Sequence, residues 1–96
     1  MSQEVMILTE DRPVLEPLLR AAIEHEKRLV QMGIEKTLRR LAEFEQLHAM
    51  SSDEFEHRMN TLELSETPDF SDWRMEIGIL RLLEHQYIVL QNARVN

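Results

Sequence analysis

The fold of this chain is decided by residues 13–48, whose sequence reads PVLEPLLRAAIEHEKRLVQMGIEKTLRRLAEFEQLH. Apolar residues recur here at steps of three, four and seven, which is the period of one face of an α-helix. Pro13 and Pro17 suit a helix start, because the first turn tolerates a missing N–H. We therefore predict one amphipathic helix that starts between residues 13 and 17 and ends near His48. Its apolar stripe comprises Leu15, Leu19, Ile23, Val30, Ile34, Leu38, Leu41 and Phe44, widened by Leu18, Ala22 and Leu29.

A short second helix is predicted after this stretch. Residues 51–54 read Ser-Ser-Asp-Glu and match the capping box, in which the serine oxygen accepts a backbone N–H and the glutamate bonds back to the serine. Phe55, Met59 and Leu62 then follow at steps of four and three. The helix should end before Pro68, because a proline disfavours helical angles at the residue before it.

A third helix is predicted from about residue 70 to residue 92. Asp69 is expected to cap it, and Asp72 brings a negative charge to the first turn, where the helix dipole favours one. Its apolar positions form two neighbouring stripes, which comprise Trp73, Ile77, Leu80 and Tyr87 in one and Ile79, Leu83 and Leu90 in the other.

Composition agrees with an all-α fold. The chain has 96 residues, of which only two are glycine and three are proline, while 43% are hydrophobic and 30% are charged. Helix-forming residues dominate and turn-forming residues are scarce. With no cysteine, a disulfide framework, a thiolate zinc site and a cysteine nucleophile are excluded. We see neither an export signal nor a run of apolar residues long enough to span a membrane, and we expect a cytoplasmic location.

The predicted architecture is a long antiparallel helical hairpin with a short crossover helix. A helix over residues 17–48 would be roughly 48 Å long, whereas a compact domain of this size has a radius of gyration of about 12–13 Å. The long helix would therefore extend beyond any core within the chain. We expect a partner or a second copy to cover the remaining apolar surface, and a homodimer is the simplest such assembly.

An N-terminal arm, residues 1–11, is expected to precede a single helical domain, residues 12–96. The arm contains the apolar run Val5-Met-Ile-Leu8 between polar neighbours. Such a run suits an edge strand or an anchoring segment. The arm would lie either on the chain's own helices or along the sheet edge of a partner.

Charge is unevenly distributed along the chain, whose net charge is −7. Residues 43–72 hold nine acidic side chains and one basic side chain, Arg58, whereas residues 12–42 hold seven bases and four acids. Nucleic-acid binding requires a basic face, so we regard a nucleic-acid partner as unlikely. The acidic segment is either a solvated surface or a surface complementary to a basic protein.

Catalytic and metal-binding motifs are weak or missing in the sequence. Glu45-x-x-His48 and Glu54-x-x-His57 have the spacing found in di-metal helix bundles, but such sites also need further inward-facing glutamates. We see no glycine-rich phosphate loop, nucleophile elbow or zincin motif. We therefore expect neither enzymatic activity nor a cofactor or metal. We expect a structural or solvent-exposed role for His48, because an imidazole at a helix end can cap the last carbonyls or interact favourably with the helix dipole.

The segment Met50-Ser-Ser-Asp-Glu-Phe55, with Leu62-Glu-Leu64 and Asp69-Phe70-x-x-Trp73 before a leucine-rich helix, resembles a family of small prokaryotic all-helical proteins. Many members of that family look like antitoxins encoded beside small toxin genes. The resemblance covers roughly residues 38–90. It implies a non-catalytic protein that binds a cognate protein, such as a ribonuclease-type toxin, and neutralises it.

These observations predict an antitoxin-like module that occludes the basic groove of a toxin with an acidic surface such as residues 53–72, while the apolar stripe of the last helix supplies affinity. The alternative is a structural or regulatory helical subunit without a toxin partner. Phe70 and Trp73 are core residues in one interpretation and exposed anchors of an interface in the other. The residues predicted to bind the partner are Glu63, Glu66, Asp69, Phe70, Asp72 and Trp73.

Overall fold

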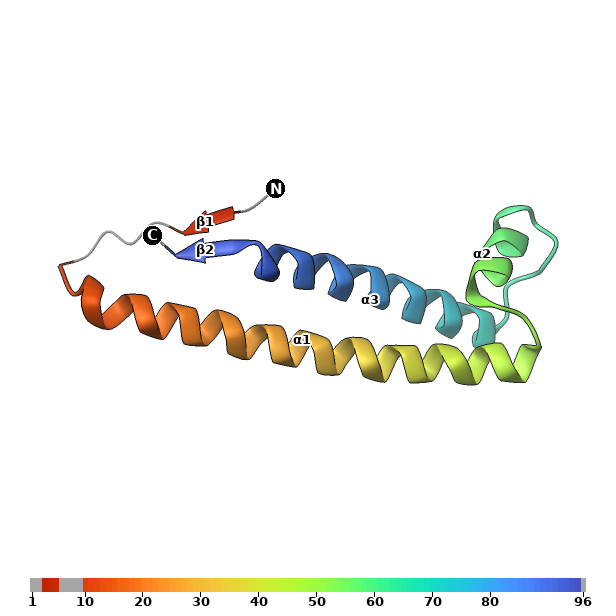
Figure 1. Ribbon diagram of the computed structural model, residues 1–96. Helices are drawn as coiled ribbons and strands as arrows, with labels where there is room; N and C mark the ends of the chain where they lie inside the picture. Colours follow the sequence, from red (N-terminus) through yellow and green to blue (C-terminus); the bar gives the residue numbers. More distant parts are fainter. Residues whose placement is uncertain (1–2, 6–9, 96) are drawn as a thin grey trace. The chain divides into compact units, whose positions relative to one another are not determined.

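The computed structural model describes residues 3–5 and 10–95, and it confirms an all-α helical hairpin with a short crossover helix (Figure 1). The helices are α1 (Arg12–His48), α2 (Ser52–Asn60) and α3 (Pro68–Gln91). Two three-residue strands, β1 (Gln3–Val5) and β2 (Ala93–Val95), lie near the ends of the chain. None of the helices in this described part has the length and apolar content needed to cross a membrane.

The chain divides into two compact units, and each contains a part of α1 and a part of α3. The α2 unit is residues 34–82, and the strand unit is residues 1–33 together with residues 83–96. We describe the two units separately.

An aromatic core holds the α2 unit together. Trp73 of α3 stacks on Phe55 of α2 with ring centroids 3.9 Å apart, and Phe44 of α1 stacks parallel to Trp73 at 5.6 Å. All three helices thus contribute a ring to one cluster. Its buried members are Leu41, Phe55, Met59, Trp73 and Ile77, with Phe44, Met50, Leu64, Phe70 and Leu80 packed around them.

Helix α2 begins at the predicted cap, but only half of the capping box forms. Ser51 Oγ accepts the N–H of Glu54 at 3.0 Å, as predicted. The carboxylate of Glu54 accepts from Arg58 at 2.7 Å instead of bonding back to Ser51. The neighbouring N–H of Ser52 donates to Glu45 of α1 at 2.7 Å, so a residue from another helix satisfies this end of α2.

Helices α1 and α2 both end in a left-handed residue that is not glycine. Ala49 has φ 54° after α1, and Leu62 has φ 61° after α2. The N–H of Leu62 donates to Met59 O, and the N–H of Glu63 donates to Arg58 O at 2.9 Å. These two bonds form the Schellman motif, whose left-handed position usually carries glycine.

The start of α3 corrects one prediction. Thr67, not Asp69, caps this helix: Thr67 Oγ1 accepts the N–H of Phe70 at 3.1 Å. Pro68 is the first helical residue, where its missing N–H costs nothing. Asp69 therefore lies inside the first turn of α3, and its side chain is left for another contact.

The strand unit is held by fewer buried side chains. β1 pairs in parallel with β2, with Glu4 opposite Arg94. Residues 3–5 of the arm therefore pair with the chain's own last strand, and the carbonyl of Asp11 accepts the N–H groups of Val14 and Leu15 in α1. Residues 6–8 of the apolar run lie outside the described residues. Among the apolar residues described here, Val30 of α1 and Val95 of β2 are buried. Arg20 of α1 donates to the carbonyl of Val95 at 3.2 Å.

Candidate functional site

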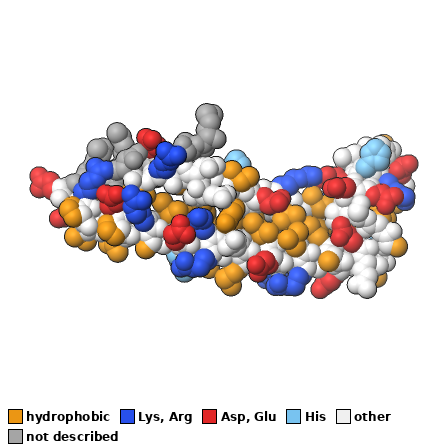
Figure 2. Space-filling view, viewed as in Figure 1, with side chains coloured by type: hydrophobic (Ala, Val, Ile, Leu, Met, Phe, Trp, Pro, Cys, Tyr) orange, Lys and Arg blue, Asp and Glu red, His pale blue; other side chains and the backbone are white. Residues whose placement is uncertain are grey.

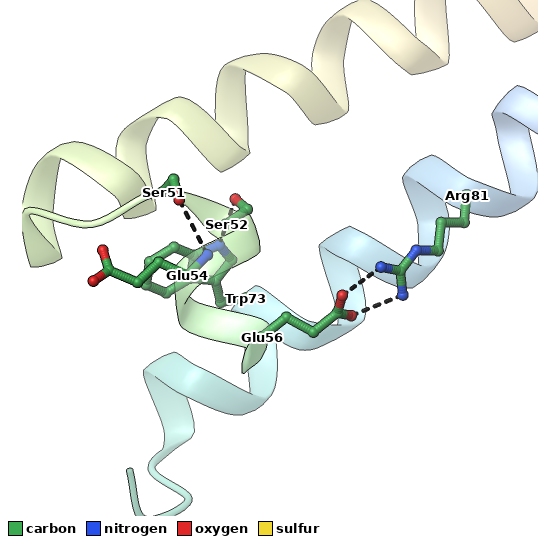
Figure 3. A network of polar contacts seen from close by, with 6 residues as sticks. All are labelled: Ser51, Ser52, Glu54, Glu56, Trp73 and Arg81. Carbon is green, nitrogen blue, oxygen red and sulfur yellow. Dashed lines mark hydrogen bonds and ion pairs between the residues drawn. The ribbon is translucent and has the colours of Figure 1, made fainter. Parts of the chain in front are cut away.

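Trp73 is a core residue in this structure. Its exposed fraction is 0%, and its indole N–H donates to Ser52 Oγ at 3.0 Å (Figure 3). The ring is in contact with aromatic neighbours from α1 and α2. Of the two interpretations of Trp73, the structure supports the core one, and Trp73 stabilises the surface that carries the other candidates.

Phe70 and Asp69 enclose His48. Phe70 is half-buried, and its ring meets the ring of His48 edge-on with centroids 5.1 Å apart. The ring of Trp73 stacks on the ring of His48 with centroids 5.5 Å apart. His48 Nε2 lies 2.9 Å from Asp69 Oδ2. His48 therefore has a structural role, in a contact between α1 and α3, and Asp69 is already paired within the chain.

Glu66 is also paired within the chain. Its carboxylate accepts from Ser71 Oγ at 2.7 Å and from Arg74 Nη1 at 2.9 Å. These donors, the Ser71 hydroxyl first and the Arg74 guanidinium after it, hold the pKa of Glu66 below its ordinary value. Glu66 therefore stays ionised at neutral pH and orders the turn before α3.

Glu63 and Asp72 are the two acidic residues of the predicted site whose carboxylates are unpaired among the described residues. Both are exposed, and neither carboxylate has a hydrogen-bond or ion-pair partner among residues 3–5 and 10–95. Figure 2 shows acidic side chains interspersed with a few basic ones over α2. The acidic segment is thus partly neutralised by internal pairs, whereas the carboxylates of Glu63 and Asp72 remain exposed to solvent.

One internal pair joins α2 to α3. Arg81 Nη1 donates to Glu56 Oε2 at 2.7 Å, and Arg81 Nη2 donates to Glu56 Oε1 (Figure 3). This bidentate bond is the main reason why the pKa of Glu56 is lowered. Glu56 therefore fixes α2 on α3 and is not available to a partner.

Leu62 is a candidate that the sequence did not reveal. Its side chain is 88% exposed, and its backbone has φ 61°. A left-handed conformation costs a non-glycine residue about 1–2 kcal/mol. The chain therefore holds an apolar side chain in solvent at a strained position, next to the open carboxylate of Glu63. Strain of this kind is concentrated at functional sites.

The structure does not bring the Glu45-x-x-His48 and Glu54-x-x-His57 motifs together into one site among the described residues. Glu45 accepts from the N–H of Ser52, and His48 lies against Asp69. In the described ranges, no group of three or more histidine and acidic side chains has a geometry that would hold a metal ion.

Comparison of the chain with protein-family models, with curated proteins and with solved structures finds no match.

Proposed function

We propose that this chain is a non-catalytic, antitoxin-like module that binds a basic protein through the segment 61–72 and neutralises it by occlusion. The observation that carries this proposal is Leu62, an exposed leucine held in a left-handed backbone conformation beside Glu63. Apolar anchors surrounded by charged groups are typical of protein interfaces. The resemblance of residues 38–90 to antitoxin-like proteins supports the same reading.

In the proposed mechanism, charged residues speed association and an apolar residue slows dissociation. Glu63 and Asp72 would attract a basic groove and speed the encounter, because exposed charges act mainly on association rates. Leu62 would supply apolar contact and slow dissociation. A toxin that binds RNA presents such a basic groove, and an acidic surface seated there would exclude the substrate.

The test begins with affinity capture of the tagged chain from its source cells and identification of bound proteins by mass spectrometry. We expect a small basic protein, encoded next to this chain, whose ribonuclease activity falls when the purified chain is added. A captured protein whose activity is unaffected by the chain would contradict neutralisation.

Leu62→Gly separates binding from folding. Glycine relieves the left-handed strain but enlarges the entropy of the unfolded chain, so the free energy of unfolding should stay unchanged or rise by up to about 1 kcal/mol. Binding to the captured protein should weaken, with faster dissociation. Leu47→Ala, which also removes an exposed leucine of the α2 unit, is the matched control and should bind normally. Equal binding by both variants would remove Leu62 from the interface.

A second candidate function, a helical subunit that assembles with itself, is favoured by a different surface. In the strand unit, four exposed apolar residues of α1 follow one another at steps of 4, 11 and 3, which return to the same side of a helix. They are Val14, Leu18, Leu29 and Met32, with Val14 65% and Met32 64% exposed. Exposed apolar stripes of this kind mark interfaces between proteins.

Light scattering of the purified chain tests this second function. At micromolar concentration we expect twice the monomer mass. Leu18→Glu should return the mass to that of a monomer, whereas Leu82→Glu, an exposed leucine of α3 outside the stripe, should not. A monomeric wild-type chain would exclude self-assembly through this stripe.

A further inference from the structure

A polar pocket opens between α1 and α3 within the α2 unit. Its volume is about 390 Å³. The residues that line it are Arg40, Glu43 and Phe44 of α1 and Asp72, Met75 and Glu76 of α3. The pocket therefore includes Asp72, one of the two predicted acids that have no partner within the described chain.

Negative charge dominates this pocket. Three carboxylates, those of Glu43, Asp72 and Glu76, face one guanidinium, that of Arg40. Arg40 is half exposed and already donates to Glu76 at 2.7 Å, so water and that carboxylate screen its charge. Glu43 and Asp72 are exposed and unpaired among the described residues. The excess of carboxylates over guanidinium leaves the pocket with a net negative charge, which attracts a cation.

Glu76 supplies an independent indication that a hydrogen-bond donor belongs here. The residue is only 7% exposed, and its Oε1 accepts from Arg40 Nη1. The other carboxylate oxygen, Oε2, is buried and has no donor among residues 3–5 and 10–95. A buried acceptor without a partner costs about 1–3 kcal/mol, more for a charged group. Its persistence is explained if a ligand brings the missing donor.

The chemistry of the pocket favours a guanidinium over other cations. A guanidinium offers five N–H donors in a plane and bonds carboxylates in pairs, whereas an ammonium is a single point charge. The ring of Phe44 lines the same pocket, and a guanidinium stacks on aromatic rings. Met75 is exposed, and its flexible thioether can move to admit the group.

We propose that this pocket receives an arginine side chain of the protein partner, an inference that rests on the proposed protein-binding function. The arginine would bond Glu43 and Asp72 at the pocket entrance and donate to Glu76 Oε2 within it. The site would then be a specificity pocket, which selects a partner that presents arginine at this point over one with a neutral side chain.

The test uses N-acetyl-arginine amide as the probe in a titration followed by amide chemical shifts of the ¹⁵N-labelled full chain. We expect saturable shifts at Glu43, Asp72 and Glu76. N-acetyl-citrulline amide has nearly the same shape without the charge and should give none. N-acetyl-lysine amide should bind more weakly than the arginine probe.

The decisive variant is the pair Glu43→Gln with Asp72→Asn, because both residues are exposed and their replacement leaves the core intact. We expect the affinity for the arginine probe to fall about tenfold. Glu35→Gln with Asp53→Asn makes the same change of charge at exposed residues outside the pocket and should alter the affinity less than about twofold. Glu76→Gln is a weaker test, because Glu76 is buried and holds Arg40.

Four outcomes would overturn the proposal. Equal shifts with citrulline would exclude recognition of charge, and an unchanged affinity in the Glu43→Gln, Asp72→Asn variant would exclude the pocket. Binding of the probe without capture of any protein would refute the proposed function and assign the pocket to a small cation. Capture of a protein by a chain that does not bind the probe would refute the arginine pocket alone.

Discussion

The α2 unit and the strand unit bury their apolar side chains to different extents. In the α2 unit, rings from three helices stack around Trp73, and Phe55 and Trp73 have no exposed surface. In the described residues of the strand unit, the short β1–β2 pair is the only other element beside α1 and α3, and Val14, Leu18, Leu29 and Met32 are exposed. Two helices cover only one side of each other, whereas a third element encloses a core. The enclosed aromatic core therefore belongs to the α2 unit, whereas exposed apolar side chains occur in both units, with Leu47 and Leu62 among them in the α2 unit.

The largest expected effect comes from removing the centre of the aromatic core. Trp73→Ala should lower the free energy of unfolding by about 3–5 kcal/mol, because it empties a fully buried site that three helices share. Val30→Ala, at a buried position of the strand unit, should cost less, since a smaller group is removed. Urea denaturation followed by circular dichroism measures both. Equal losses would mean that the two units are equally well packed.

The hydrogen bond from Trp73 to Ser52 allows the stability of the aromatic core to be compared with that of the α2 cap. Ser52→Ala leaves the buried indole N–H without an acceptor and should cost about 1–3 kcal/mol. Ser51→Ala removes only the cap of α2 and should cost about 1 kcal/mol. In the Trp73→Phe background the indole N–H is absent, so Ser52→Ala should lose most of its effect. An undiminished effect there would mean that Ser52 acts on α2 alone.

The two glycines give one probe in each unit. A Cβ at Gly78 of the α2 unit would meet no atom within 4 Å, whereas a Cβ at Gly33 of the strand unit would lie 3.1 Å from Leu83 Cδ1. Alanine is more favourable than glycine in a helix by about 1 kcal/mol. Gly78→Ala should therefore stabilise by nearly that amount, and Gly33→Ala by less, because Leu83 must move. Thermal melts measure the difference, and equal gains would show that α1 and α3 are loosely packed at Gly33.

The smallest effect concerns acid pH and one carboxylate from each unit. Arg81 lowers the pKa of Glu56 in the α2 unit, and Arg20, with Arg12, lowers the pKa of Glu16 in the strand unit. A carboxylate whose pKa is depressed by folding stabilises the folded state above its unfolded pKa, near 4.5. That contribution is lost as the pH falls below this value through the folded pKa.

Urea midpoints at pH 7, 4 and 3 measure this loss. Glu56→Gln should reduce the pH dependence more than Glu16→Gln, because Glu56 joins two helices whereas Glu16 pairs within one turn of α1. If Glu16→Gln had the larger effect, the pair between α2 and α3 would not contribute to folding stability.

The helices themselves were largely predictable from the sequence. The 3.6-residue period of residues 13–48 predicted α1, and Ser51 marked the start of α2, because both signals act over a few residues. The cap of α3 was predicted wrongly at Asp69. Thr67 followed by Pro68 fits the same rules equally well, and local spacing cannot choose between two capping residues that lie two positions apart.

The candidate site was less predictable, because its members are defined by contacts between distant residues. Glu66 and Asp69 are acidic residues as expected, but their carboxylates are already paired within the chain. Glu66 pairs with Arg74, and Asp69 pairs with His48. The orphaned oxygen of Glu76 arises from its burial between helices. The residues around Leu62 do not indicate a left-handed backbone conformation, because glycine is the usual sequence signal for that conformation.

The sequence by itself determined a helical hairpin with an acidic crossover, because helix periodicity, capping and charge are properties of neighbouring residues. Only the tertiary structure decided that Trp73 lies in the core, that β1 pairs with β2 and that the pocket beside Glu76 keeps an excess of carboxylates. Each of these depends on which groups, many residues apart, come together and exclude water, and burial of that kind is a property of the packed chain.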